Sequence, residues 1–546
     1  MMRSLLGGHW DVVIVGYGPT GAVAASLLGQ AGVRVLVIDR AEEVYDKPRA
    51  LALDHEIMRV FQQLGIIDEI RAYTEPFTSS EYFGVDGKLI KRLGMVPPPY
   101  PLGYVPSLVF SQPMVEKALR EHVQSISCVD VALSYRCVTL EQNAEGVCLS
   151  LIDREGNDVT LSADYVIGCD GASSTVRSQL NIGLEDLGFD EPWLVVDMLV
   201  NERGLAKLPA SSVQYCEPER PCTYVIGPKN HRRWEISLLP HEDPALMATE
   251  AEAWRLLERW IGPEDAVLWR QAAYRFHALV AKEWKVGRAF IAGDAAHQQP
   301  PFLGQGMCQG IRDAVNLSWK LASVLKGQAD VSLLETYANE RGRHVRTLTG
   351  QIKAIGAVIC ERNRGRAEER DRQLLSQAQG EVSMQARQDI IPPLETGMLH
   401  LDGHSSIGTI FPQPQMKMLT GLVLMDEIVG YGWRIISNVD IAAIPAAIRS
   451  LATRVGKLVC FGGSNVIALS PERSEFSLCE VEGVVEKWFH RYDCIAAVVR
   501  PDHYVFGAVR SLDDLPDLLA DLPQAEALHK ERLVISESGN QSWLIS

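Results

Sequence analysis

The sequence predicts an α/β fold, in which a Rossmann-like domain is interleaved with a β-rich domain and followed by a separate C-terminal domain. Three observations predict it. A glycine-rich turn near the start separates an apolar strand from a helix of small residues. A second glycine-bearing turn follows a strand near residue 290, and short strands and helices dominate after residue 396. The 546 residues are also too many for one ordinary domain.

The first turn favours a dinucleotide site because of its place between the strand 11–15 and the helix predicted over 20–29. Its first glycine permits a tight turn, its second lets the backbone approach a pyrophosphate, and its third lets helix and strand pack closely. The helix start offers free N–H groups and a positive dipole end to phosphates. A second strand, 33–39, ends in an acid where ribose hydroxyls are commonly bound. The predicted contacts are Gly16, Gly18, Pro19, Thr20, Gly21, Asp39 and Arg40.

The segments between the two turns predict an alternation of two domains. Residues 76–104 leave the nucleotide domain, and alternating runs over 129–166 predict a β-meander. Residues 186–284 are strand-rich and predict a mostly antiparallel sheet, whereas the polar segment 377–387 predicts a linker. We assign 1–75, 105–185 and 285–375 to the nucleotide-binding domain, 76–104 and 186–284 to a substrate-binding β-sheet domain, and 396–546 to the C-terminal domain.

The second turn predicts a partner for the other end of the same ligand. An acid after Gly293 would accept hydrogen bonds from a ribityl chain, and a proline pair would stiffen the wall beside a flavin ring. The start of the helix that follows would stabilise negative charge at the pyrimidine end of that ring. We interpret the two turns as the two ends of one FAD site. The predicted contacts of this second half are Asp170, Gly293, Asp294, Pro301, Gly304, Gly306, Met307 and Cys308.

Composition excludes several classes of function. The net charge of −16 argues against a nucleic-acid-binding surface, which needs clustered Lys and Arg. The sequence contains no run of eighteen apolar residues, so it predicts no membrane-spanning helix. The 11 cysteines form no C-x-x-C pair, which predicts reduced thiols in the cytoplasm and no structural metal site.

These segments together resemble the single-component (class A) FAD-dependent aromatic hydroxylases, which share the para-hydroxybenzoate hydroxylase fold. The resemblance covers about residues 10–375. The segment 287–321, the pair Glu340-Arg341 and the late Arg500-Pro501-Asp502 resemble most the 3-(3-hydroxyphenyl)propionate hydroxylase branch. Membership of that branch implies a thioredoxin-like C-terminal domain without a redox pair.

The resemblance also implies residue roles and a reaction. Arg49 would contact the FAD pyrophosphate or ribose, Gln112 the ribityl chain, and Arg233 the flavin or the substrate. NADH or NADPH would reduce FAD, O2 would form a flavin C4a-hydroperoxide, and a phenolic aromatic acid would be hydroxylated. Cys308 departs from the pattern, because the family often has Asn there.

The sequence offers fewer candidates for contacts with the substrate than for contacts with the cofactor. Asp54 and His55 are candidates to activate the phenol, Tyr215 to hydrogen-bond it, and Arg233 to bind its carboxylate. Two alternatives stay open: another FAD enzyme, such as a reductase or a halogenase, and a non-catalytic flavin-binding protein. The Trp-x-Trp-x-Ile-Pro segment of flavin halogenases is absent. The exact substrate, the choice of nicotinamide and a homodimeric state are left open as well.

Overall fold

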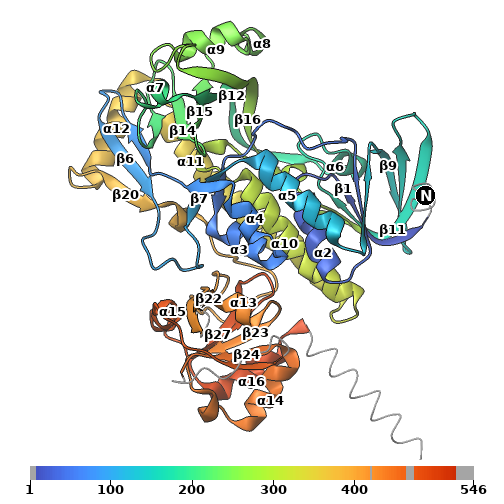
Figure 1. Cartoon of the computed structure of the whole chain (residues 1–546). Helices are drawn as coiled ribbons and strands as arrows, with labels where there is room; N and C mark the ends of the chain where they lie inside the picture. The colour runs from blue at the N-terminus through green and yellow to red at the C-terminus, as the bar shows by residue number, and fades with distance from the viewer. Residues whose placement is uncertain (1–7, 419–420, 463–472, 524–546) are drawn as a thin grey trace, which may run out of the picture.

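The computed structural model describes residues 8–418, 421–462 and 473–523. It shows three parts (Figure 1): a nucleotide-type α/β domain, a large β-sheet beside it, and a C-terminal α/β domain against the helices α3 and α10. The fold class predicted from the sequence is thereby confirmed. Within the described ranges, no helix has both the length and the apolar character that crossing a membrane requires.

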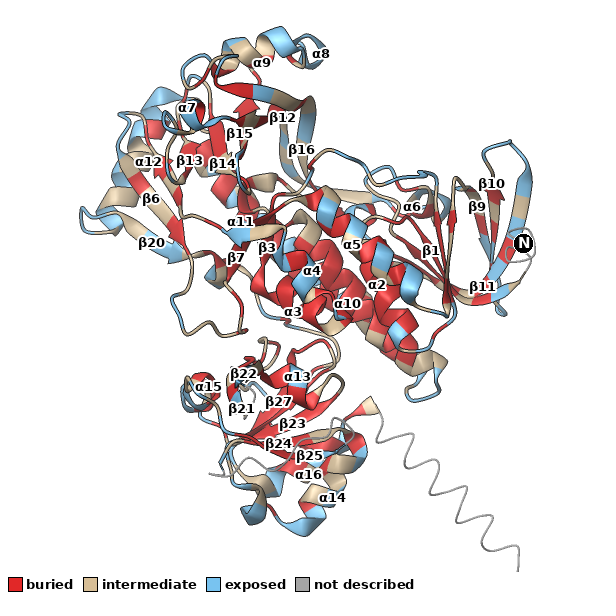
Figure 2. Cartoon of the chain, in the orientation of Figure 1, coloured by how far each residue is buried: buried red, intermediate tan, exposed pale blue. Residues whose placement is uncertain are grey.

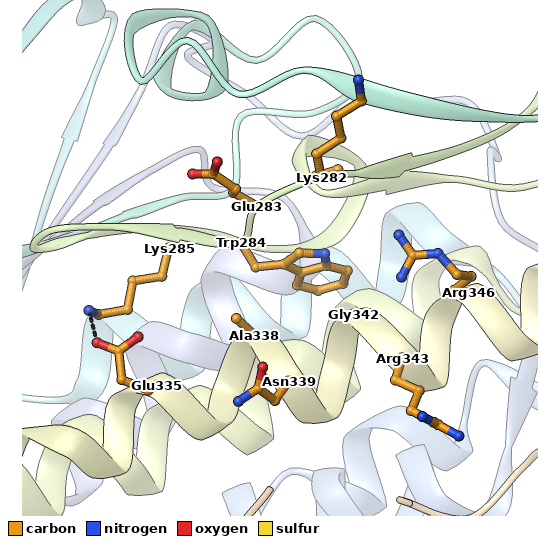
Figure 3. Close-up of a pocket in the computed structure, with 11 residues that line it drawn as sticks. Lys282, Glu283, Trp284, Lys285, Glu335, Ala338, Asn339, Gly342, Arg343 and Arg346 are labelled. Atoms are coloured by element: carbon orange, nitrogen blue, oxygen red, sulfur yellow. Dashed lines mark hydrogen bonds and ion pairs between the residues drawn. The ribbon is translucent and has the colours of Figure 1, made fainter. Parts of the chain in front are cut away.

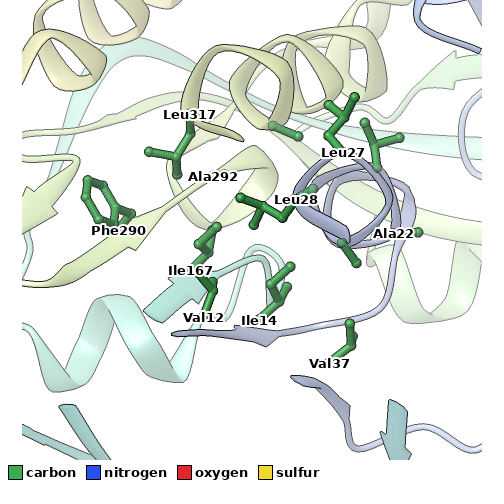
Figure 4. Close-up of a cluster of buried hydrophobic side chains, with 14 of the residues drawn as sticks. Val12, Ile14, Ala22, Leu27, Leu28, Val37, Ile167, Phe290, Ala292 and Leu317 are labelled. Atoms are coloured by element: carbon green, nitrogen blue, oxygen red, sulfur yellow. The ribbon is translucent and has the colours of Figure 1, made fainter. Parts of the chain in front are cut away.

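The first domain is built on an eight-stranded sheet whose central strands are parallel, in the order β18-β11-β1-β2-β8. Parallel strands are covered on both faces, which explains why 12–15 and 35–38 are continuous apolar runs. Figure 4 shows this core, with Leu28 of α2 and Leu317 of α10 close to Ile14 and Ile167. The elements are β1 (His9–Val15), α2 (Pro19–Gln30), β2 (Val35–Asp39), α5 (Gln112–Ser125), β8 (Val129–Leu133), β9 (Arg136–Gln142), β10 (Val147–Ile152), β11 (Asp158–Gly168), α6 (Thr175–Gln179), β17 (Lys285–Val286), β18 (Ala289–Ile291) and α10 (Gly306–Leu325).

A small three-stranded sheet and two helices connect this domain to the second one. They are β3 (Ala52–Asp54), α3 (His55–Leu64), α4 (Ile67–Arg71), β4 (Thr74–Pro76) and β7 (Ser107–Phe110). Beyond them the chain enters a nine-stranded sheet of order β19-β16-β12-β15-β14-β13-β5-β6-β20. Its strands are β5 (Ser80–Phe83), β6 (Leu89–Gly94), β12 (Leu184–Val200), β13 (Ser212–Tyr215), β14 (Cys222–Ile226), β15 (His231–Ser237), β16 (Ala266–Ala281), β19 (His297–Gln298) and β20 (Ser383–Ala386).

The edge of this sheet corrects one prediction. The segment 377–387 is not only a linker, because β20 lies within it and pairs in parallel with β6. Strand alternation gives the sheet two different faces. One face packs its aromatic and aliphatic side chains against α8 (Pro244–Met247) and α9 (Glu250–Leu257), while α11 (Glu335–Ile359) covers part of the other.

The C-terminal domain holds a five-stranded sheet of order β25-β24-β23-β26-β27. β23 is parallel to β24 and antiparallel to β26, and β26 is antiparallel to β27, which is the thioredoxin-like arrangement. All 11 cysteines of the chain are free, including the three in this domain, Cys460, Cys479 and Cys494. The elements are α13 (Met425–Val429), β23 (Arg434–Ser437), α14 (Ala446–Val455), β24 (Lys457–Cys460), β25 (Glu475–Ser477), α15 (Val484–Tyr492), β26 (Ala496–Val499), β27 (Val505–Val509) and α16 (Leu515–Ala520).

Buried ion pairs join this domain to the first one. Arg59 of α3 pairs with Asp426 at 2.7 Å, and Arg500 pairs with Glu340 of α11 at 2.7 Å. All four side chains are fully buried, and Figure 2 shows buried residues on both sides of this interface. The C-terminal domain is therefore docked by specific, desolvated contacts.

Candidate active site

One cavity of about 460 Å³ connects the first domain with the nine-stranded sheet. At one end it is lined by Gly18, Pro19 and Thr20 of the first turn, and at the other by strands β13, β14 and β15. Asp294 and Gly306 of the second turn line it as well. A second pocket of about 340 Å³ lies between Trp284 and α11 (Figure 3) and contains none of the predicted site residues.

The two glycine-bearing turns meet in space, as the sequence predicts. Gly293 has a left-handed φ of +62°, and a Cβ there would lie 2.7 Å from the Thr20 hydroxyl oxygen. Thr20 belongs to the first turn, 273 residues earlier by position, and it also lines the cavity. Only glycine permits this approach, so Gly293 acts by letting the second turn close against α2.

Two helices present uncapped N-termini to the cavity. The cap residues, Gly18 for α2 and Gln305 for α10, make no side-chain hydrogen bond to the first turn of their helix. A Cβ on Gly18 or on Gly306 would have no neighbour within 4 Å, so the space beside both backbones is open. Free N–H groups and two positive dipole ends therefore face one cavity, which fits the pyrophosphate of FAD at α2 and its electron-rich ring edge at α10.

Polar side chains complete this half of the cavity. Gln112 accepts hydrogen bonds from the backbone N–H groups of Arg49 (3.1 Å) and Ala50 (2.6 Å), which fixes the loop that carries Arg49. The Arg49 side chain is 54% exposed and lies 4.0 Å from Glu116. Asp294 lines the cavity, and desolvation by the surrounding protein raises its pKa. These groups could hold the ribose, phosphates and ribityl hydroxyls of FAD, and Pro301, Gly304 and Met307 line the same cavity.

Several predicted cofactor residues support the cavity without lining it. Asp39 accepts from the backbone N–H of Tyr17 at 2.6 Å, so its carboxylate holds the first turn, and Arg40 is exposed. Asp170 caps α6 by accepting from the N–H of Thr175 at 2.7 Å. The Cys308 thiol is buried and donates to a backbone carbonyl of β3. Of the predicted set, those outside the cavity lining are Gly16, Gly21, Asp39, Arg40, Asp170, Gly293 and Cys308.

The expectation that Asp54 and His55 face the substrate cavity is wrong, since neither lines it. Asp54 caps α3 by accepting from the N–H of Ile57, and it pairs with Arg312 at 2.6 Å. His55 is buried beside it, and burial lowers its pKa to about 4. Both residues are oriented by the start of α3, whose first turn points into the core instead of toward the sheet.

Tyr215 is also misplaced by the prediction, because strand alternation directs it to the other face of the sheet. Its hydroxyl accepts from the indole N–H of Trp260 at 3.1 Å, in the core beside α9. The neighbouring Gln214 lines the cavity instead. A one-residue difference on a strand exchanges the two faces completely.

Arg233 lines the cavity, but its charge is already paired. Its guanidinium donates to the two carboxylate oxygens of Asp197 at 2.7 and 3.1 Å, and to the backbone carbonyls of Pro48 and Arg49. Burial opposes the ionisation of Asp197, yet the Arg233 charge outweighs it and lowers the pKa of Asp197 to about 2. Arg233 thus anchors the Arg49 segment to the sheet.

The sequence reasoning missed four charged residues that line the cavity: Glu235, Arg270, Arg275 and Arg387. Glu235 lies two positions after Arg233 on β15, and burial raises its pKa to about 7. Arg387 is buried, donates only to the Ser80 hydroxyl (3.3 Å) and the Leu303 carbonyl (2.6 Å), and has no acidic partner in the described structure. Side chains two positions apart on a strand point to the same face, so the prediction of Arg233 could have led to Glu235. No local pattern in the sequence indicates Arg387.

Comparison with known proteins decides the family. The model of the FAD binding domain family (FAD_binding_3) matches residues 9–351, and that of the HcaD C-terminal domain matches residues 408–525. This chain belongs to the FAD-dependent aromatic hydroxylases. A similar relative of this hydroxylase, 35% identical over 95% of both chains, is the "probable NADH-specific resorcinol 4-hydroxylase" of Rhodococcus jostii (strain RHA1). The 3-(3-hydroxy-phenyl)propionate/3-hydroxycinnamic acid hydroxylase of Burkholderia cenocepacia (strain HI2424) is 31% identical, over 91% of this hydroxylase and 93% of the relative.

Solved structures share the fold of the hydroxylase. The flavin-dependent monooxygenase PieE, in complex with FAD and substrate, superposes with a TM-score of 0.79 at 22% identity and covers 96% of this chain and 99% of its own. Aklavinone-11 hydroxylase in a ternary complex with FAD and aklavinone superposes with a TM-score of 0.76 at 21% sequence identity. The match covers 95% of this chain and 99% of that structure. The family match confirms the predicted FAD cofactor. Among the described residues, no group of three or more His, Cys, Asp or Glu side chains could hold a metal ion.

Proposed function

We propose that this hydroxylase uses NADH and O2 to hydroxylate a phenol that carries an acidic side chain, such as a 3-(3-hydroxyphenyl)propionate-like compound. One observation carries the proposal: the cavity that contains both uncapped helix N-termini also extends over the polar face of the nine-stranded sheet. FAD, when bound, supplies the hydride acceptor and the oxygen activation. The relative named NADH-specific supports NADH over NADPH.

The residues of the chain would bind, orient and desolvate. The start of α2 would hold the pyrophosphate, Asp294 the ribityl hydroxyls, and the start of α10 the negative charge of the reduced ring. Val195 and the aromatic rings of Phe276 and Phe302 line the cavity and give it an apolar wall. Such a wall excludes water and strengthens every electrostatic interaction with the substrate.

The acidic side chain of the substrate would be bound by Arg387, not by Arg233. Arg233 is neutralised by Asp197, whereas the Arg387 guanidinium donates only to neutral oxygens. A buried guanidinium without a carboxylate partner is costly, and a substrate carboxylate would supply that partner.

The experiment is phenol-dependent NADH oxidation by the FAD-loaded protein, followed together with O2 uptake. We expect 3-(3-hydroxyphenyl)propionate or a related hydroxyphenyl acid to accelerate NADH oxidation at least tenfold, with hydroxylated product formed. Resorcinol is the neutral comparison in the same panel. Phenol-independent NADH oxidation without product would indicate a reductase, and a flavin that NADH never bleaches would indicate a non-catalytic flavin-binding protein.

Three further parts of the sequence prediction are kept as proposals. Residues 76–104 and 186–284 would form the substrate-binding part, and 1–75, 105–185 and 285–375 the FAD-binding part. A cytoplasmic location is supported by 11 free cysteines, which suit a reducing compartment.

A homodimer would be tested by light scattering at micromolar concentration, where a mass of about 60.4 kDa would contradict it.

A further inference from the structure

Glu235 occupies the middle of the cavity face of the nine-stranded sheet. It lies on β15 between Val195 of β12 and Thr223 of β14, its direct cross-strand neighbours. Gln214 of β13 is opposite Thr223, so Val195, Glu235, Thr223 and Gln214 form one row across four strands. All four line the cavity, and the Glu235 side chain is only 8% exposed.

This carboxylate has no hydrogen-bond donor of its own among the described residues. The nearest cation, Arg233, lies 4.0 Å away and donates at 2.7 Å to Asp197 instead. Thr223 donates its hydroxyl to the side-chain oxygen of Gln214 at 2.6 Å, so it does not serve Glu235 either. Buried polar groups normally have partners, and a buried acceptor without one points to a ligand that supplies the donor.

We propose that Glu235 is the catalytic base of this hydroxylase, accepting the hydrogen bond of the substrate's phenolic hydroxyl and taking its proton during hydroxylation. The proposal rests on the proposed function above. The amide nitrogen of Gln214, whose oxygen is occupied by Thr223, is the adjacent donor to the same phenolic oxygen. The substrate class is therefore a phenol whose hydroxyl enters the cavity toward β15.

The proton balance is complete with the substrates already named. As the new carbon–oxygen bond forms, the O–O bond of the oxygen donor derived from O2 breaks. The phenolic O–H bond breaks as well, its electron pair moves toward the ring, and the proton goes to the Glu235 carboxylate. The first product is a ring ketone whose hydroxylated carbon still carries its hydrogen. That carbon then loses its proton to water, and Glu235 returns its own proton to the ketone oxygen, which restores the aromatic ring. The net reaction takes phenol, O2, NADH and one proton to dihydroxy product, water and NAD⁺.

Protonation equilibria in the row agree with this role. Desolvation raises the pKa of Glu235, Arg233 lowers it, and Asp197 raises it again, so that it titrates near pH 7. Cys222, the residue before Thr223 on β14, lies on the opposite face of the sheet in the core with Trp234, and burial raises the pKa of its thiol. A base that titrates near the working pH transfers protons most effectively.

The test compares Glu235→Gln with the wild type, both loaded with FAD. We expect kcat/KM for the phenol to rise with pH through about pH 7 in the wild type. In Glu235→Gln this rise should disappear, and the plateau should fall about 100-fold, as for removal of a general base. Glu81→Gln is the matched control, since Glu81 lies on β5 of the same sheet, directly after the cavity-lining Ser80, but does not itself line the cavity.

A binding measurement without turnover makes the test independent of rate. Phenylpropionate and its 3-hydroxy derivative are titrated, without NADH, into the FAD-loaded wild type and Glu235→Leu. We expect the hydroxyl to strengthen binding about tenfold in the wild type and less than twofold in the variant. An unchanged pH profile in Glu235→Gln, or an equal hydroxyl preference in Glu235→Leu, would overturn the proposal. If the wild type itself shows no phenol-dependent NADH oxidation, the proposed function fails first.

Discussion

Two buried carboxylates of this molecule, Glu340 and Glu235, lie in opposite electrostatic situations. Glu340 accepts from the Arg500 guanidinium at 2.7 Å, the Asn316 amide at 2.6 Å and the Met398 backbone N–H at 2.8 Å, and pairs with Lys320 at 2.8 Å. Glu235 receives no hydrogen bond within the described structure.

Burial raises the pKa of both carboxyl groups, and their ion pairs and hydrogen bonds decide whether the pKa finally lies above or below its ordinary value. Desolvation opposes the ionisation of Glu340, but Arg500 and Lys320 outweigh it and hold its pKa well below the ordinary range. At Glu235 desolvation prevails, and the pKa rises to about 7. Full pairing therefore marks a carboxylate that holds domains together, whereas a buried carboxylate on a cavity wall that receives no hydrogen bond marks chemistry.

Buried ion pairs also connect the C-terminal domain to a helix that lines the cavity. Arg312 of α10 pairs with Asp54 and Glu56 at 2.6 Å each, and Tyr504 of the C-terminal domain donates to Glu56 at 3.1 Å. The N-terminus of the same α10 lines the cavity. The ionic interface thus connects the docked domain to the helix whose N-terminus lines the cavity.

The largest expected effect comes from breaking the paired carboxylate. Glu340→Ala leaves Arg500 and Lys320 buried without their partner, which should lower the free energy of unfolding by about 3–5 kcal/mol. Urea unfolding measures it. The exposed Glu395, paired with Arg343 at the surface, is the control, and Glu395→Ala should cost no more than about 1 kcal/mol. Equal effects of the two substitutions would contradict the distinction drawn here.

The unpaired carboxylate should behave in the opposite way. Its pKa in the folded protein, about 7, exceeds its ordinary value of 4.5, so its ionisation costs stability as pH rises between these values. Glu235→Gln should therefore gain about 2–3 kcal/mol relative to the wild type between pH 5 and pH 8. Urea unfolding of both FAD-loaded proteins at the two pH values checks this. A difference that does not change with pH would mean that Glu235 is not an unpaired buried acid.

Asp294 extends the comparison to the cofactor end of the cavity. Desolvation raises its pKa as well, and no described residue donates a hydrogen bond to its carboxylate. If FAD hydroxyls supply the donors, Asp294→Ala should weaken FAD binding about 10–100-fold, the worth of a hydrogen bond to a charged group. Flavin content after desalting measures the loss, and Asp294→Asn should retain more flavin than Asp294→Ala. Undiminished flavin in Asp294→Ala would refute this placement.

Arg387 offers the smallest of the four effects and the most selective one. Arg387→Gln should raise KM for a hydroxyphenyl acid about tenfold, because a charged hydrogen bond is lost. For resorcinol, which has no carboxylate, KM should change less than twofold. Steady-state NADH oxidation with both phenols gives the two values. A matching loss for both compounds would show that Arg387 supports the fold and not the substrate carboxylate.

Local patterns predicted that the two glycine-bearing turns meet, but they did not predict which residues of the nine-stranded sheet line the cavity. The βαβ unit around Gly18 and the turn at Gly293 depend on residues close in sequence, and the structure places both on one cavity or against it. The choice of Tyr215 failed because it needed the exact phase of a four-residue strand. Arg387 was unpredictable because β20 pairs with β6, almost 300 positions earlier, and nothing local specifies that pairing.

The most direct test of the account is hydroxylation under ¹⁸O₂ by the FAD-loaded protein, with NADH and a hydroxyphenyl acid. We expect a dihydroxy product with one ¹⁸O atom in the new hydroxyl group and close to one product molecule for each NADH consumed. A flavin-loaded protein that consumes NADH and returns the phenol unlabelled would contradict it.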